Sequence, residues 1–217
     1  MNLVLGIYQQ GFREGCLAHM NIAMHEMRRY CTCRGRNFRY LSTVNCGFPL
    51  PQGIFYPNYG NVYVYVLCHT VNKRGDEQLQ LNGKENPIYD DELIKELKKI
   101  KCKQLSLVLE TCHSEGIVGP EDEPIPSNWN VVTTCARDEK SLYSEKEKMG
   151  CYTKALKGMS GNSRIPVFAF SPEIVCESAN RMMRGMETIS CKGNGKWLDT
   201  CDELLKSRSE RRCRYNK

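Results

Sequence analysis

The stretch NVYVYVLCHT, residues 61–70, decides the fold of this chain. Valine and tyrosine alternate from Val62 to Val66 without a polar residue, and β-branched and aromatic residues favour extended strands. A strand without a polar face is typical of a parallel sheet that is covered on both sides. We therefore predict a buried central strand, which brings His69 and Thr70 to the carboxyl edge of the sheet.

Further strands and helices alternate along the chain. Four more apolar runs are predicted to be strands or extended segments: 3–8, 104–111, 130–136 and 165–170. Apolar side chains at helical spacing predict helices over 16–30 and from Asp90 or Asp91 to about Ile100, and 150–159 resembles a short helix. Alternation of this kind predicts an α/β fold with a mostly parallel sheet flanked by helices.

The chain of 217 residues is long enough for one domain with a real core. Turn-forming segments, GFPLPQG and YPNYG, predict that residues 31–60 form an insertion or long loop. We predict one domain over residues 1–172, followed by a C-terminal extension, 173–217, that ends in a basic tail.

Composition excludes several classes of protein. An apolar fraction of 41% with 26% charged residues is typical of a globular protein, and no apolar run approaches the ~20 residues of a membrane span. The N-terminus has no basic lead, so we expect a cytoplasmic protein without a signal peptide. Much of the net charge of +6 lies in the tail. The sequence shows no basic face with interleaved aromatics, so we do not expect nucleic-acid binding.

The 13 cysteines do not form a recognisable pattern. Their odd number argues against a full set of disulfides, and no CxxC pair is present. His25, Cys31, Cys33 and Cys46 have poor spacing for a zinc site, so we expect most thiols to pack as small apolar side chains.

Two predicted strands end in residues that suit thiol catalysis. The strand of 61–69 ends at His69, and QLSLVLET is followed at once by Cys112. Ligands of open α/β sheets gather at the carboxyl ends of the strands. If the two strands are neighbours, an imidazole lies beside a thiol, as nucleophilic thiol catalysis requires.

The residues around these two positions resemble the metacaspases, a family of caspase-like cysteine proteases. LETCHSEG is similar to the family's signature around its nucleophile, and VYVYVLCHT stands where the family has a strand ending in His-Gly. NPIYDDELIKEL, NVVTTCARDEKSLYSE and GCYTKALKGM follow the family's order over residues 61–159. The resemblance implies a caspase-like three-layer sandwich, and legumain-like proteases share the same plan of strands.

The resemblance also implies roles for individual residues. Cys112 would be the nucleophile of a cysteine endopeptidase, and His69 would protonate the leaving amine and then activate water. The backbone N–H groups of Cys112 and Thr70 would hold the oxyanion. The substrates would be proteins or peptides, and the chemistry would need no cofactor.

A specificity pocket follows from the same resemblance. Glu110 matches an acid that lines the family's primary pocket, where a carboxylate favours a Lys or Arg side chain. Thr134 and Ser141 match positions near the pocket wall, and Asn21 matches an Asp of the first helix. Self-cleavage is predicted in the loop 136–150, which contains several basic residues.

Asp90 and Asp91 allow two interpretations. Either residue is a suitable N-cap for the helix that follows, whereas in calcium-dependent metacaspases the corresponding pair helps to bind the ion. A calcium site needs six to eight oxygens, and the acidic run 121–123 could add some. Calcium activation is therefore one prediction of the resemblance.

Departures from the family pattern keep other functions open. Thr70 replaces the usual glycine, and its β-branched side chain would crowd the backbone that approaches the substrate. Glu115 is an extra residue between Ser114 and Gly116. These changes favour a weak or inactive caspase-like scaffold as the second interpretation, and a legumain-like asparaginyl endopeptidase is the third. For an endopeptidase of this kind we expect a monomer.

Overall fold

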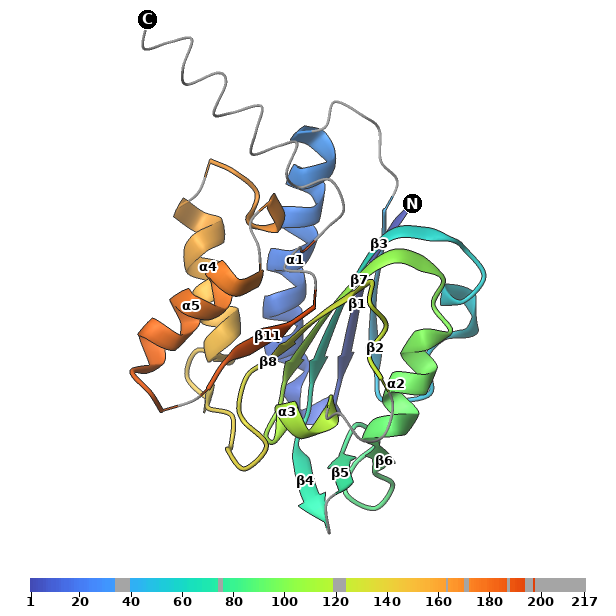
Figure 1. The fold of residues 1–217 in the computed structure, drawn as a ribbon, viewed down its shortest axis with the longest axis vertical. Helices are drawn as coiled ribbons and strands as arrows, with labels where there is room; N and C mark the ends of the chain where they lie inside the picture. Colours follow the sequence, from blue (N-terminus) through green and yellow to red (C-terminus); the bar gives the residue numbers. More distant parts are fainter. Residues whose placement is uncertain are drawn as a thin grey trace, which may run out of the picture.

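The centre of the molecule is a six-stranded sheet in the order β11–β8–β7–β3–β1–β2 (Figure 1). The computed structural model describes residues 1–33, 40–73, 76–118, 124–162, 164–169, 172–186, 188–193 and 197. The strands are β1 (Asn2–Tyr8), β2 (Tyr40–Cys46), β3 (Tyr59–Leu67), β7 (Cys102–Glu110), β8 (Trp129–Thr133) and β11 (Ser190–Lys192). Only β11 is antiparallel to its neighbour in this sheet, as far as the described residues extend.

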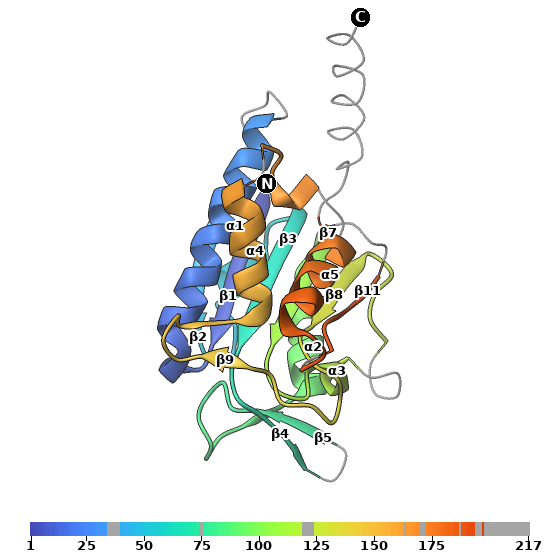
Figure 2. The same cartoon turned by 90° about the vertical axis from the view of Figure 1, so that its left-hand side faces the viewer.

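Helices cover both faces of this sheet (Figures 1 and 2). One face carries α1 (Arg13–Cys33), α4 (Cys151–Asn162) and α5 (Pro172–Met183), and the other face carries α2 (Asp90–Lys98). The short α3 (Ser114–Ile117) lies at the carboxyl edge. The architecture confirms the predicted α/β sandwich with a mostly parallel sheet.

Smaller elements surround the carboxyl edge. A second sheet joins β4 (Thr70–Lys73), β5 (Asp76–Leu79) and β6 (Ile88–Tyr89), all antiparallel. Strands β9 (Tyr143–Ser144) and β10 (Met149–Gly150) form a hairpin. Three 3₁₀ helices complete the described elements: Gln10–Phe12, Gln52–Ile54 and Val167–Ala169.

Strand β3 explains why its sequence has no polar face. Its tyrosines, Tyr63 and Tyr65, pack into the core beneath α1 and α4, whereas Val62, Val64 and Val66 pack into the core beneath α2. Successive side chains of a strand point to opposite faces, so a strand between two helical layers needs apolar residues at every position.

The prediction of an insertion over 31–60 was wrong in its central part. Residues Tyr40–Cys46 form β2, which pairs in parallel with β1 along its whole length. β2 is the last strand of the sheet and most of its side chains are half-buried or exposed. An edge strand of this kind can keep the polar residues of YLSTVNC, and its sequence therefore lacks a strand pattern.

Two other predicted segments also differ. Residues 165–170 were expected to be extended, but Val167–Ala169 form a 3₁₀ helix, and the Val167 N–H donates to the buried Glu26 carboxylate at 2.6 Å. In the C-terminal segment, α5 packs on α4, and β11 adds a strand beside β8. The described part of 173–197 therefore belongs to the main fold, not to a separate extension.

Within the described ranges, no helix is both long enough and apolar enough to cross a membrane.

Candidate active site

The carboxyl ends of β3 and β7 bring the two predicted catalytic residues to one cavity. The strands are parallel neighbours, and Leu67 lies opposite Glu110. His69 and Cys112 each follow two residues later, so the two chains leave the sheet at the same level. Both residues line a cavity of about 60 Å³.

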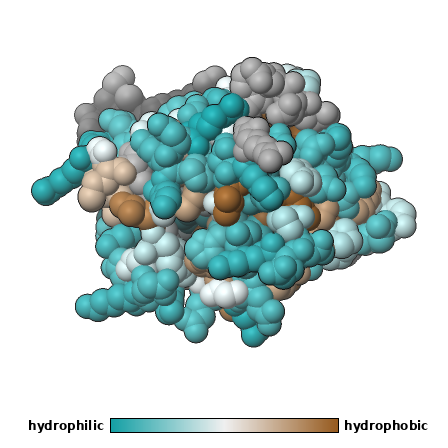
Figure 3. Space-filling view, turned by 90° about the horizontal axis from the view of Figure 1, so that it is seen from below, coloured by the Kyte–Doolittle hydropathy of each residue, from teal (hydrophilic) through white to brown (hydrophobic). Residues whose placement is uncertain are grey.

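The other walls of this cavity come from several segments of the chain. They are formed by Phe12, Leu67, Cys68, Glu110, Thr111, Ser141, Leu142, Tyr143 and Gly150. Figure 3 views the molecule from this end, where a few hydrophobic side chains emerge among mostly hydrophilic ones. The cavity therefore combines an apolar wall with a thiol, an imidazole and a carboxyl group.

His69 is exposed at this edge and is held from the side of the 3₁₀ helix Gln10–Phe12. Its backbone N–H donates to the side-chain oxygen of Gln9 at 3.0 Å. Its ring contacts the ring of Phe12 edge-on, with centroids 4.7 Å apart. The imidazole is thus oriented by packing and remains accessible to a substrate.

Cys112 is half-buried, and the turn that follows it is fixed by His113. His113 has a φ of 56°, in the left-handed region that few non-glycine residues adopt. Its N–H donates to the Glu139 carbonyl at 3.0 Å, and its Nδ1 lies 2.7 Å from the Arg137 carbonyl oxygen. His113 therefore supports the loop of residues 137–139.

Ser114 binds the same turn to the end of β8. Its buried hydroxyl oxygen accepts the N–H groups of Thr134 and Cys135, at 2.9 and 3.0 Å. The hydroxyl lies 3.1 Å from the Cys135 carbonyl oxygen, to which it donates. The residues that follow the thiol in the Cys-His-Ser motif thus hold the thiol at the sheet edge through backbone groups of β8 and the next loop.

Thr70 does not crowd the cavity, contrary to the expectation from its side chain. It is 5% exposed and is not among the residues that line the cavity. Its Oγ1 lies 2.5 Å from Oγ1 of Thr111, the residue before Cys112. The β-branched side chain therefore points into the protein, between the ends of β3 and β7.

The Thr70 backbone N–H is directed away from β5. The Gln80 N–H donates to the His69 carbonyl at 2.9 Å, so residues 69 and 80 form a hydrogen-bonded pair. The next pair, Thr70 and Leu79, is then a non-hydrogen-bonded pair, whose N–H groups point away from the partner strand. This N–H is therefore not used in the pairing with β5.

Glu110 lines the cavity, is 2% exposed and has both carboxylate oxygens engaged in hydrogen bonds. Oε1 accepts the N–H groups of Tyr152 and Thr153 in the first turn of α4, at 3.0 and 3.3 Å. Oε2 accepts the hydroxyls of Tyr65 and Thr153. Burial raises the pKa of this carboxyl, and the four hydrogen bonds oppose the rise. Glu110 therefore also caps α4, a role that the sequence did not indicate.

The first helix contributes His19, not Asn21, to this region. Asn21 is exposed on α1 and does not line the cavity, so the structure does not bring it together with the other predicted site residues. His19 is fully buried, stacks on Tyr65 at 3.6 Å and lies 2.7 Å from the Thr153 hydroxyl. Burial lowers its pKa to about 3.

The sequence contains a signal for the buried position of His19. Residue 19 lies on the same helical face as Cys16, Met20, Ala23 and Met27, all fully buried. A histidine on an apolar face must find internal partners, and here they are Thr153 and the Tyr63 hydroxyl at 2.9 Å.

Thr134 and Ser141, which match positions near the family's pocket wall, lie next to each other. Ser141 lines the cavity, and its hydroxyl is 3.2 Å from the hydroxyl of the buried Thr134. Thr134 itself supports the wall and does not line the cavity.

Asp90 and Asp91 do not fit a calcium site within the described residues. The Asp91 carboxylate forms an ion pair with Lys95 at 2.6 Å, and Asp90 accepts the Asp91 N–H. No group of three or more metal-ligating side chains is found among the residues that the structure describes. The acidic residues 121–123, which could add ligands, lie outside the described residues.

The pair is not the N-cap of α2 either. That position is Tyr89, whose N–H donates to the Glu92 carboxylate at 2.9 Å.

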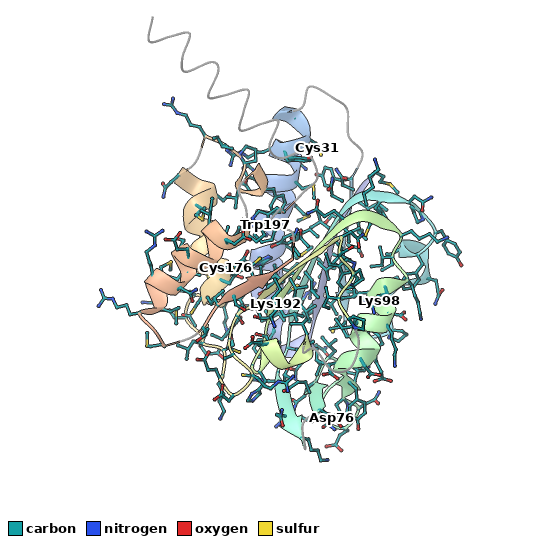
Figure 4. All side chains as sticks on the ribbon, in the orientation of Figure 1. Cys31, Asp76, Lys98, Cys176, Lys192 and Trp197 are labelled. Atoms are coloured by element: carbon teal, nitrogen blue, oxygen red, sulfur yellow. The ribbon has the colours of Figure 1, made fainter. Side chains whose placement is uncertain are left out.

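The remaining predicted features lie around the rim. Glu115, the extra residue of the turn, turns toward β11 and pairs with Lys192 at 3.4 Å (Lys192 is labelled in Figure 4). Lys146 and Lys148 are exposed in the β9–β10 hairpin. These two lysines stay predicted sites of self-cleavage.

A comparison of the chain with protein-family models and with curated proteins finds no match.

Proposed function

We propose that this protein is a cysteine endopeptidase with Cys112 and His69 as its catalytic dyad. The observation that carries the proposal is their position at the ends of two hydrogen-bonded parallel strands, where both line one cavity. A thiol and an imidazole at the same edge of a sheet can share a proton, which thiol catalysis requires.

The surrounding groups supply the other parts of the mechanism. The Cys112 thiolate attacks the scissile carbonyl, and His69 gives its proton to the leaving amine. His69 then takes a proton from water, which hydrolyses the acyl-enzyme. The N–H groups of Cys112 and Thr70 would hold the oxyanion. The inward position of the Thr70 side chain supports an active enzyme over the inactive scaffold.

The cavity favours a substrate with a Lys or Arg side chain before the cleaved bond. Among the residues that the structure describes, Glu110 is the one carboxyl group that lines it, and the other wall residues are mainly apolar or hydroxyl-bearing, apart from the dyad. A cation that enters stabilises the ionised carboxylate, whose pKa is otherwise raised by burial. The stems of Lys and Arg suit the apolar wall formed by Phe12 and Leu67.

The proposal is tested with fluorogenic peptides that end in Arg, Lys, Asn or Asp. We expect the purified protein to cleave the Arg and Lys peptides, and both Cys112→Ala and His69→Ala to lower kcat at least about 1000-fold. Cys102→Ala, at the opposite end of β7, is the matched control and should retain full activity. Glu110→Gln should reduce kcat/KM for the basic peptides most.

Activity that survives Cys112→Ala would exclude this thiol as the nucleophile. Cleavage of the Asn peptide alone would contradict the assigned preference and support the legumain-like alternative.

A further inference from the structure

Thr70 and Thr111 connect the two predicted catalytic residues through their side chains. Thr70 follows His69 directly, and Thr111 directly precedes Cys112. Their hydroxyl oxygens are 2.5 Å apart. The bond therefore joins the residue that follows His69 to the residue that precedes Cys112.

This bond lies beyond the end of the strand pairing. β3 ends at Leu67 and β7 at Glu110, and the chain after His69 pairs with β5 instead. Side-chain hydrogen bonds between residues 68–70 and 111–113, as described, all use the Thr111 hydroxyl. The regular ladder thus stops before the dyad, and this hydroxyl holds the two chains together past that point.

Burial gives this contact its strength. Thr70 is 5% exposed and Thr111 is 2% exposed. The only other side-chain partner described for either hydroxyl is the Cys68 thiol, at 3.9–4.0 Å, a weak donor. Burial raises the pKa of this thiol to about 12, so it stays neutral beside the two hydroxyls. Removal of one hydroxyl leaves the other without a good buried partner.

We propose that the Thr70–Thr111 hydroxyl pair is a positioning device that sets the distance between the His69 imidazole and the Cys112 thiol. This inference rests on the proposed dyad and assigns a function to the threonine that stands where the metacaspase pattern has glycine. A glycine has no side chain to form such a bond. A displacement of about 1 Å between reacting groups lowers a rate up to about 100-fold, so a single buried bond at this place affects the chemical step.

The test compares threonine-to-valine variants, which remove a hydroxyl and keep the shape. Thr70→Val and Thr111→Val should each lower kcat about 10- to 100-fold with KM changed less than about twofold, because only the chemical step loses its geometry. The double variant should be no slower than the worse single variant, because both changes break one bond. Thr70→Ser, which keeps the hydroxyl, should restore most of kcat.

Thr133→Val is the matched control. Thr133 is buried in β8, and its hydroxyl lies 2.8 Å from the Ser190 hydroxyl of β11, away from the cavity. This variant loses an equivalent bond between strands, so a general loss of stability would appear in it too. If Thr70→Val and Thr133→Val lower kcat equally, the positioning function is refuted.

A second readout does not depend on peptide cleavage. The rate of Cys112 alkylation by iodoacetamide, followed by mass spectrometry of its peptide, measures how far the imidazole activates the thiol. His69→Gln should lower this reactivity, and Thr70→Val should lower it by most of the same amount. If the wild-type protein shows this reactivity but cleaves no peptide, the proposed peptidase activity is refuted and the positioning function is still supported. A Thr70→Val protein that alkylates like the wild type would overturn the positioning function alone. If Cys112 is alkylated at the same rate in the wild type and in His69→Gln, there is no dyad to position, and the positioning function is overturned as well.

Discussion

At the scale of single residues, the carboxyl edge of the sheet depends on buried polar groups that satisfy one another. Glu110 is surrounded by two hydroxyls and two backbone N–H groups, and His19 reaches the same Thr153 hydroxyl from α1. Each of these groups would be costly to bury alone. The network lies between α1 and α4 on one side and β3 and β7 on the other, so it fixes the wall of the cavity to two layers of the fold, the sheet and the helices on one of its faces.

His19 should make the protein less stable in mild acid. Its pKa is 6.5 in the absence of the fold and about 3 within it, so below pH 6.5 only the unfolded chain takes up this proton. The stability from neutral His19 is therefore lost as the pH falls from about 6.5, by up to about 1.4 kcal/mol per pH unit.

Urea unfolding of wild type and His19→Gln at pH 7, 6 and 5 measures this effect. The difference in the free energy of unfolding between the two proteins should become smaller toward pH 5. Glu110 acts in the opposite direction, because its raised pKa favours the folded state at low pH, but it is present in both proteins. His25→Gln, exposed on the same helix, is the control, and the prediction fails if both variants give curves parallel to the wild type.

At the scale of elements, the start of α4 is shaped by its contact with the end of β7. Glu110 caps the first turn of α4, and Gly150 lies directly before that helix. A Cβ on Gly150 would lie within 2.1–2.8 Å of the Glu110 side chain. The close approach of β10 to this carboxylate therefore requires a residue without a side chain.

Gly150→Ala should destabilise the protein by about 1–3 kcal/mol, the range of an overpacked core. Gly158→Ala, in the middle of α4 with open space around it, should instead stabilise the protein by roughly 0.5–1 kcal/mol. Thermal melting of both variants gives the comparison. Equal effects at the two positions would show that Glu110 moves aside without cost.

At the scale of the whole molecule, the C-terminal part completes the core on one face of the sheet. Trp197 is 1% exposed and lies among the rings of Tyr63, Tyr152 and Phe168, with centroids 5.5–6.3 Å away (Figure 4). Its carbonyl accepts the Ser106 hydroxyl at 2.6 Å. A residue near the end of the chain is thus held by β7 and by the aromatic residues beneath α1.

Trp197→Ala should lower the free energy of unfolding by about 3–5 kcal/mol, as expected for a buried aromatic side chain. Met186→Ala, at a side chain that is 65% exposed, should change it by less than about 0.5 kcal/mol. Urea denaturation distinguishes the two. Similar urea midpoints of unfolding for both variants would contradict this prediction and would support the separate C-terminal extension that the sequence suggested.

Local patterns in the sequence were sufficient for the central elements. The apolar runs within β1, β3, β7 and β8 and the helical spacing of α1 and α2 predicted a parallel sheet between helices, because such patterns can be recognised from residues close together in the chain. The order of the motifs also placed His69 and Cys112 at the ends of strands, and the register of β3 and β7 brings them to one cavity.

Only the tertiary structure decided the features that depend on residues far apart in the chain. The polar sequence of β2 is a strand because β1 offers it a free edge. Glu110 meets Thr153 across 43 residues, and Thr70 meets Thr111 across 41. A hydrogen bond of this kind leaves no periodicity in either segment, since its partner is set by the packing of layers and not by the local chain.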